Sequence, residues 1–131
     1  MSEEWTVTVE DLVFIHSAAI ARYGGASGIR DVGSLEAAVA RPYVSFRGQE
    51  MFPGPFAKAA ALMESVIQRH PFVDGNKRTG AASAVYLLRR RGYRLVRVTN
   101  AQLVELSLNV AAYRMNTEEL EAWFEDHAES V

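Results

Sequence analysis

Apolar side chains recur along most of the chain three or four residues apart, which is the spacing of an amphipathic α-helix. In the first such segment the apolar positions are Val9, Leu12, Val13, Ile20 and Tyr23. Thr8 and Asp11 form a candidate capping pair at its start, and Gly24-Gly25 supply a stop signal. We therefore predict a first helix between Thr8 and Tyr23.

The middle of the chain contains two helical segments joined by a sharp turn. In the first, one helical face is formed by Phe56, Ala59, Ala60, Met63, Ile67 and His70, and Pro71 then ends the helix. In the second, from Asn76 to Arg91, the apolar stripe is Ala82, Val85, Tyr86 and Leu88, with Gly92 as the stop. Asp74-Gly75 provide the turn, so a helix, turn, helix unit is predicted here.

The remaining segments predict shorter elements. Ser34 is a candidate N-cap for a helix from Leu35 to Arg41, which Pro42 ends. The pairs Thr99/Gln102 and Asn116/Glu119 have capping-box spacing and predict two further helices. The segment from Pro42 to Pro55 predicts a long loop or small flap, and Tyr93 to Val98 a short strand or extended connection. The predicted fold class is all-α, with about six helices and a short strand or flap.

Composition and charge narrow the functional classes. With 131 residues, 49% hydrophobic and 23% charged, we expect one compact domain covering residues 1–131. The absence of cysteine excludes disulfides, thiolate metal sites and a cysteine nucleophile. The acidic start and the short apolar stretches lead us to expect a soluble, cytoplasmic protein with no membrane partner.

Two charged clusters lie toward the end of the chain. Arginines crowd positions 89 to 97, and acidic residues crowd positions 118 to 129, and their opposite charges would allow the two clusters to face each other. Because the net charge is only -2, we interpret the arginines as a solvated helix end and expect no direct binding of nucleic acid.

Chemistry concentrates in the segment from His70 to Gly80, HPFVDGNKRTG. A base, His70, and a hard-cation ligand, Asp74, precede a helix start at which Gly75, Asn76 and Lys77 can form an anion-binding nest of backbone N–H groups. Lys77 and Arg78 would add two formal charges. This inventory suits phosphoryl or nucleotidyl transfer, in which Mg²⁺ bridges phosphate oxygens and a base accepts the proton of the acceptor hydroxyl.

Each of these residues also has a purely structural interpretation. His70 is favoured at a helix C-terminus, and Asp74 is a typical N-cap of the following helix. Cations in the first helical turn oppose the helix dipole, so Lys77 and Arg78 favour an anion as partner. His16 and His127 have no comparable neighbours in the sequence, and we interpret them as structural or surface residues.

The segment HPFVDGNKRTG resembles the Fic/Doc motif, and its Asn-Lys-Arg-Thr ending resembles the Doc (death-on-curing) toxins. The flanking stretches Gly28 to Pro42 and Ala57 to Phe72 are similar to the same family. This resemblance implies a small Fic fold and a toxin of a type II toxin-antitoxin module. It further implies a kinase that transfers the ATP γ-phosphate to a threonine of elongation factor Tu and halts translation. A Phd-type antitoxin, whose flexible C-terminal segment folds into a groove on the toxin, is the implied partner.

By the same resemblance, His70 would be the general base, Asp74 the Mg²⁺ ligand, and Asn76, Lys77 and Arg78 the ATP phosphate ligands beside Gly75. Phe72 would anchor the loop in the core. The Fic adenylyltransferase pattern has glycine in place of Lys77 and arginine in place of Ala81, so the adenylyltransferase pocket is altered here.

Two alternatives to the kinase stay open. One is a Fic-like nucleotidyltransferase that attaches AMP to a protein hydroxyl, and the other is a non-catalytic module that acts through its antitoxin. A separate hypothesis assigns the loop from Arg41 to Pro55 to alignment of the target peptide near the site.

Overall fold

The computed structural model describes residues 5–131 of the chain. In this part the predicted all-α class is confirmed, with helices α1 (Val9–Tyr23), α2 (Val32–Ala40), α3 (Pro55–Arg69), α4 (Asn76–Arg90), α5 (Asn100–Ala111) and α6 (Thr117–Asp126). A 3-10 turn, Arg41–Tyr43, follows α2. None of these helices combines the length and the apolar character needed to cross a membrane.

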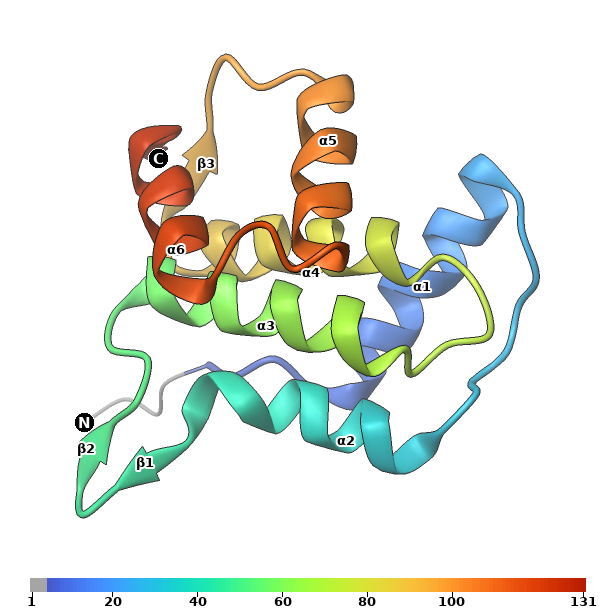
Figure 1. Cartoon of the computed structure of the whole chain (residues 1–131), viewed down its shortest axis with the longest axis horizontal. Coiled ribbons are helices and arrows are strands. Elements are labelled where there is room, and N and C mark those ends of the chain that lie inside the picture. Colours follow the sequence, from blue (N-terminus) through green and yellow to red (C-terminus); the bar gives the residue numbers. More distant parts are fainter. Residues whose placement is uncertain (1–4) are drawn as a thin grey trace.

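The central element of the fold is α3, which packs against α2, α4, α5 and α6. Figure 1 shows α3 running through the middle of the molecule, with α2 on one side and α5 and α6 on the other. From Ala57 to Ile67 every residue of α3 except Glu64 is buried, so the helix is surrounded on nearly all sides. Both ends of α3 nevertheless reach the surface, and each end leads into a loop.

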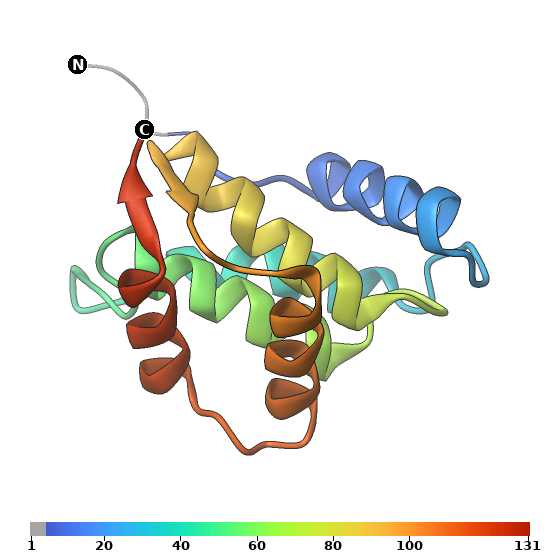
Figure 2. The ribbon, with the colours of Figure 1, turned by 90° about the horizontal axis from the view of Figure 1, so that it is seen from above.

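A second layer forms around α4, which lies against α3 and also contacts α1 and α5. Seen from above in Figure 2, α1 and α5 flank α4 on opposite sides. The crossing of α3 and α4 is close at Gly80, where an added Cβ would lie 2.8 Å from Ile67 Cγ1 and 3.2 Å from the Met63 carbonyl oxygen. Any larger residue at position 80 would push the two helices apart.

Local capping signals fix most helix starts. The three predicted capping boxes are confirmed at Thr8, Thr99 and Asn116, each with reciprocal side-chain and backbone bonds. The predicted cap of α2 is wrong, because Asp31 rather than Ser34 accepts the free backbone N–H, from Gly33 at 3.1 Å. Ser34 instead lies in the first turn and donates its hydroxyl to Asp31 Oδ2 at 2.8 Å.

Two antiparallel ribbons complete the described chain. The predicted flap is a small hairpin of β1 (Ser45–Phe46) and β2 (Gln49–Glu50). The predicted strand after α4 is confirmed in shorter form as β3 (Tyr93–Leu95), which pairs with β4 (Ala128–Ser130), a strand that was not predicted. This pairing sets Arg94 opposite Glu129, with Nη2 and Oε1 2.7 Å apart, so the two charged clusters do face each other at this point.

Candidate functional site

The helix, turn, helix unit brings the reactive segment, residues His70 to Gly80, to the exposed end of α3. His70 is the C-cap residue of α3, is exposed, and adopts a left-handed backbone conformation with φ 50°. This region of backbone conformation is unfavourable for residues other than glycine, so the fold must hold His70 in place. The turn from Pro71 to Gly75 then leads into α4.

Arg30 holds the end of α3. Its Nε donates to the carbonyl oxygen of His70 at 2.5 Å, and its Nη2 donates to the carbonyl oxygen of Arg69 at 2.8 Å. These carbonyls belong to the helix end, where intrahelical donors are missing. The guanidinium of Arg30 therefore caps α3 and fixes the backbone on which the His70 side chain is mounted.

The segment between α1 and α2 also pairs with the turn through its backbone. The N–H of Arg30 donates to the Pro71 carbonyl at 2.7 Å, and the N–H of Val73 donates to the Gly28 carbonyl at 3.0 Å. Between these bonds, Ile29 and Phe72 form an isolated antiparallel bridge. Residues 28–31 thus act as a short strand that runs along the loop of residues 70–75, which we call the site loop.

The turn is anchored from below by Phe72, whose predicted place in the core is confirmed. The side chain of Asn76 closes the turn from within: its Oδ1 accepts the N–H of Phe72 at 3.0 Å, and its Nδ2 donates to the carbonyl of Phe72 at 2.9 Å. Both polar atoms of the Asn76 carboxamide are thereby used on the loop backbone. What Asn76 presents at the helix start is its backbone N–H.

Asp74 lies exposed on the turn, with its carboxylate held by two backbone donors. Oδ2 accepts the N–H of Ala26 at 3.2 Å, and Oδ1 accepts the N–H of Gly75 at 2.8 Å. The bond from Ala26, followed by that from Gly75, lowers the pKa of Asp74 below its ordinary value of 3.8, against a smaller opposing effect of desolvation. Asp74 is not the N-cap of α4, since Gly75 occupies that position.

The start of α4 supplies unpaired backbone donors. The N–H of Thr79 bonds to the Gly75 carbonyl, whereas those of Asn76, Lys77 and Arg78 have no partner within residues 5–131. Gly75, with φ 76°, turns the chain so that these groups follow the loop directly. Lys77 and Arg78 are exposed beside them, so a positive helix end and two cations coincide.

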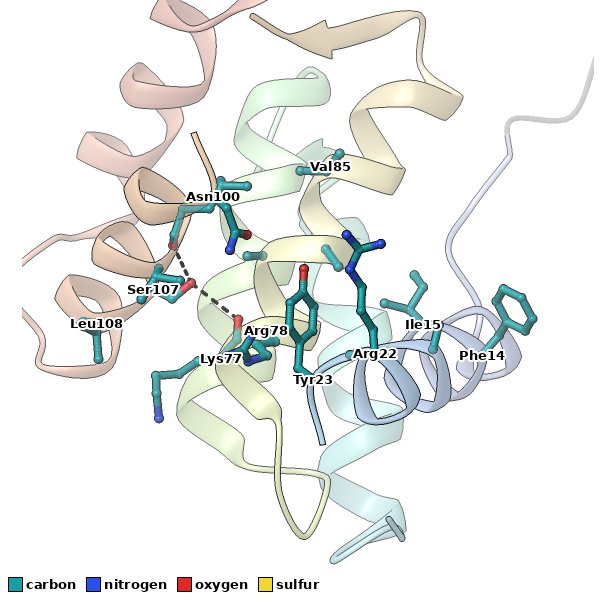
Figure 3. Close-up of a pocket in the computed structure, with 16 residues that line it drawn as sticks. Phe14, Ile15, Arg22, Tyr23, Lys77, Arg78, Val85, Asn100, Ser107 and Leu108 are labelled. Carbon is teal, nitrogen blue, oxygen red and sulfur yellow. Dashed lines mark hydrogen bonds between the residues drawn. The ribbon is translucent and has the colours of Figure 1, made fainter. Parts of the chain in front are cut away.

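Next to these cations an apolar groove of about 530 Å³ runs between α1, α4 and α5 (Figure 3). Its lining is mainly apolar, with Phe14 and Ile15 from α1, Ala81 and Val85 from α4, and Val104 and Leu108 from α5. Arg22, Lys77 and Arg78 also line it, and the guanidinium carbon of Arg78 lies 4.0 Å from the centre of the Tyr23 ring. In Figure 3 the Lys77 side chain points away from Arg22 and Tyr23.

The β1–β2 hairpin does not lie beside His70, contrary to the hypothesis that it aligns a peptide near the site. It precedes the N-terminal end of α3, whereas His70 follows the C-terminal end. A helix of 15 residues separates the two ends by roughly 22 Å. Figure 1 shows the hairpin and the α3–α4 turn at opposite sides of the molecule. The strand-like pairing with the site loop comes from residues 28–31 instead.

Two residues that support the site loop, Arg30 and His16, could not be given a functional role from the sequence alone. Arg30 acts across 40 residues of sequence, and His16, which is buried, bonds to Asp74 across 58 residues. The interpretation of His16 as structural or surface is resolved in favour of a structural residue. Sequence patterns report neighbours within one element, so neither contact left a local signal.

Similarity to known proteins identifies the family of the chain. A model of the Fic/DOC family matches residues 6–88. The chain is 39% identical over 105 residues to a protein named Toxin Doc from Mycolicibacterium smegmatis, an alignment covering 80% of this chain and 78% of the relative. It is 32% identical over 105 residues to a protein named Protein kinase doc from Escherichia phage P1, covering 80% of this chain and 81% of the relative. The chain therefore belongs to the Fic/DOC family.

Proposed function

We propose that this protein is a Doc-type toxin that acts as a protein kinase, transferring the γ-phosphate of ATP to a serine or threonine of a translation factor. The observation that carries the proposal is the convergence of His70, Asp74 and the free N–H groups of α4 on one firmly held loop. The names of its relatives, Toxin Doc and Protein kinase doc, support both parts of the proposal. Elongation factor Tu is the target that the family resemblance implies.

His70 is the proposed general base. It is exposed at the end of α3, and Arg30 fixes its backbone, so its imidazole can meet a hydroxyl of a large protein substrate. The hydroxyl oxygen attacks the γ-phosphorus and forms a new P–O bond, while the bond from the γ-phosphorus to the β,γ-bridging oxygen breaks and releases ADP. The hydroxyl proton passes to a neutral imidazole nitrogen of His70.

The phosphates of ATP are proposed to lie on the start of α4. The N–H groups of Asn76, Lys77 and Arg78 would donate to phosphate oxygens, and the ammonium and guanidinium groups would neutralise charge. Asn76 takes part through its backbone rather than its side chain, because its carboxamide is bonded to Phe72. Gly75 permits the close approach, since it brings no side chain to the helix start.

Asp74 is the proposed ligand of Mg²⁺. Its lowered pKa keeps the carboxylate ionised, and each of its oxygens accepts one N–H and keeps a lone pair free. One protein carboxylate combined with substrate phosphates is the usual way in which proteins bind this ion, so the donor set fits. When bound, Mg²⁺ would neutralise charge on the phosphates.

Transfer of the γ-phosphoryl group rather than of AMP is favoured by two positions. Lys77 adds bulk and charge where an adenylyltransferase has glycine, and its side chain is exposed at the helix start. Ala81 is buried in α4 and lines the groove, so the second arginine of the adenylyltransferase pattern is replaced by a methyl group. Both changes alter how a triphosphate would be held.

Labelled nucleotides test the proposal. Purified protein and Mg²⁺ are incubated with translation extract or with elongation factor Tu, using ATP labelled at the α- or the γ-phosphate. We expect the acceptor protein to be labelled from γ-labelled ATP only, and not by His70→Ala. Label from α-labelled ATP would show nucleotidyl transfer, and growth arrest that survives His70→Ala would show a non-catalytic binding module.

The groove between α1, α4 and α5 is the proposed binding site of a Phd-type antitoxin. It is apolar and helix-lined, Phe14 is 75% exposed and Leu108 is 51% exposed, and cations stand at its Arg78 end. An antitoxin segment that folds into a helix would place an apolar stripe in the groove and acidic residues near Arg22 and Arg78.

Substitutions in the groove separate antitoxin binding from catalysis. Phe14→Asp and Leu108→Asp are expected to abolish neutralisation by the antitoxin while phosphoryl transfer persists. Phe46→Asp is the matched control, because Phe46 is similarly exposed but lies on the distant hairpin. Normal neutralisation of Phe14→Asp and Leu108→Asp would place the antitoxin elsewhere.

A further inference from the structure

His16 lies directly beneath the site loop. Its side chain is buried, at 4% exposure, and its ring stacks on that of Phe72 with centroids 3.9 Å apart and planes 4° from parallel. Its Nε2 lies 2.8 Å from the carbonyl oxygen of Asp74. A carbonyl oxygen only accepts hydrogen bonds, so Nε2 carries the proton and donates it. One imidazole thus contacts the turn both before and after Val73.

The bond from His16 fixes a peptide plane of the loop. In a trans peptide, the carbonyl of Asp74 and the N–H of Gly75 point in opposite directions. With the carbonyl held toward His16, the N–H of Gly75 is directed away from the core, where Asp74 Oδ1 accepts it at 2.8 Å. Rotation of this plane would break both bonds and release the carboxylate of Asp74 from one of its two backbone donors.

The ring also lies close to Gly75. A Cβ placed on Gly75 would come within 3.7 Å of both Cδ2 and Nε2 of His16. Gly75 has a positive φ of 76° and opens α4, so the ring lies beside the residue from which the free N–H groups follow. The ring and its hydrogen bond to Asp74 come from α1, an element outside the reactive segment.

We propose that His16 is a positioning residue of the phosphoryl-transfer site. Through its Nε2–H it fixes the Asp74–Gly75 peptide plane, and with it the direction of the Asp74 carboxylate and of the first N–H groups of α4. The inference rests on the proposed function for its link to phosphoryl transfer, but the anchoring itself is a property of the fold. Groups that orient a ligand of the reacting centre typically change affinity or activity by about 10–100-fold when removed.

The chain offers a matched control for this role. His127 makes the same two kinds of contact, a stack on Trp123 at 4.0 Å and a bond between Nδ1 and the Trp123 carbonyl oxygen at 2.7 Å. It follows α6, whereas the site loop lies between α3 and α4. If replacing any stacked, hydrogen-bonded histidine has a general effect, variants at His16 and at His127 will both show it. An effect specific to the site loop will appear only in variants at His16.

The variants separate the ring from the donor. His16→Phe keeps an aromatic ring on Phe72 and removes the N–H, while His16→Gln removes the ring and keeps an N–H donor. Amide hydrogen exchange of residues 70–78 is measured for both variants, for His127→Phe and for the wild type, together with the kcat and KM for ATP. Amide hydrogen exchange can be measured on a protein that has no activity. If the wild type transfers no phosphoryl group, the proposed function is wrong, but the exchange rates still test whether His16 anchors the loop.

We expect His16→Phe to exchange at least about tenfold faster in the loop and to lose about tenfold in kcat/KM for ATP, with a higher KM as well as a lower kcat, because the groups that it positions hold the phosphates. His16→Gln should recover both values to within about threefold, and His127→Phe should match the wild type. Exchange in His16→Phe equal to the wild type, or a His16→Gln as impaired as His16→Phe, would overturn the donor role. If His16→Phe fails to fold, ¹⁵N spectra of the wild-type imidazole test the donor role instead. The proposal requires a slowly exchanging proton on Nε2 of His16, and a proton on Nδ1 alone would refute it.

Discussion

The two ends of α3 carry two loops that the fold holds in very different ways. At the N-terminal end, Lys58 is buried and ties the β1–β2 hairpin to the helix, with Nζ 2.5 Å from Glu50 Oε1 and 2.7 Å from the Phe52 carbonyl. At the C-terminal end, the site loop is bonded by groups from α1, from α4 and from residues 26–31. Each loop also contains a non-glycine residue in the left-handed region, Arg47 and His70 respectively.

Backbone strain is common to the two loops, whereas preorganisation is found only in the site loop. A positive φ occurs in both loops, so it does not by itself distinguish a reaction centre from a surface hairpin. What distinguishes the site loop is the number of independent anchors, which hold the carbonyl of His70, both polar groups of Phe72 and the carboxylate of Asp74. Catalytic groups need such fixed geometry because small displacements sharply reduce the rate of transfer.

The largest difference between the two loops is expected from their carboxylates. Asp74→Asn should lower phosphoryl transfer roughly 10²-fold, the size of effect produced by loss of one electrostatic stabiliser. Glu50→Gln, at the hairpin, should leave transfer unchanged and lower the melting temperature, because buried Lys58 loses its charged partner. Rates with purified acceptor and melting curves measure both. Equal loss of transfer in the two variants would contradict the proposal that only the site loop takes part in phosphoryl transfer.

Replacing one glycine at each loop by alanine should give the next largest difference in the rate of transfer. A Cβ at Gly25 would lie 2.7 Å from Asp74 Oδ2, whereas one at Gly48 meets nothing within 4 Å. Both glycines have positive φ, so each alanine costs about 1–2 kcal/mol of unfolding free energy. Gly25→Ala should in addition slow transfer about tenfold by displacing the carboxylate. Transfer by Gly25→Ala at the rate of Gly48→Ala would contradict this account of Asp74.

Arg30 and Lys58, whose long cationic side chains secure the two loops, should differ less in their effect on phosphoryl transfer. Arg30→Met removes the donors to the His70 and Arg69 carbonyls and should slow transfer about threefold to tenfold. Lys58→Met should increase amide exchange in the hairpin while transfer stays at the wild-type level. Exchange and kinetics on the same two proteins provide the check. Faster exchange of the site loop in Lys58→Met would mean that the two ends of α3 are coupled.

Between neutral pH and about pH 5 the carboxylates of Asp74 and Glu50 should both stay ionised. Hydrogen bonds from Ala26 and Gly75 lower the pKa of Asp74, and the bond from Lys58 lowers that of Glu50. A carboxylate whose pKa is lower in the folded state stabilises the fold above its ordinary value, here 3.8 and 4.5, and loses that contribution as the pH falls through the folded value. The stability difference between wild type and Asp74→Asn should therefore be constant down to about pH 5 and shrink below 3.8. A difference that already shrinks above pH 5 would place the pKa of Asp74 too high for this account.

Most helices were predictable because their signals are local. The capping boxes at Thr8, Thr99 and Asn116 each lie within four residues of sequence and were confirmed. The strand β4 was missed because its sequence, Ala-Glu-Ser, has low strand propensity and pairs only through the distant β3. The start of α2 was misplaced because Asp31 and Ser34 are both good caps, and the fold selects the earlier one.

The reactive segment was likewise visible in the sequence, while the groups that hold it were not. His70, Asp74 and Lys77 lie within eight consecutive residues, so their chemistry could be read together. The anchors His16 and Arg30 come from other elements and contact the loop only after tertiary folding. The role of the Asn76 side chain also depended on the structure, because its spacing from Phe72 does not reveal which atoms it bonds.

Phosphoryl transfer by the His70 loop is tested most directly by the intact mass of an acceptor protein after incubation with unlabelled ATP and Mg²⁺. Wild type and Arg47→Ala are compared with His70→Ala, so that the left-handed residue of each loop is removed in turn. We expect the added mass of one phosphoryl group with wild type and Arg47→Ala, and none with His70→Ala. An adenylyl mass, or a phosphoryl mass that persists in His70→Ala, would contradict it.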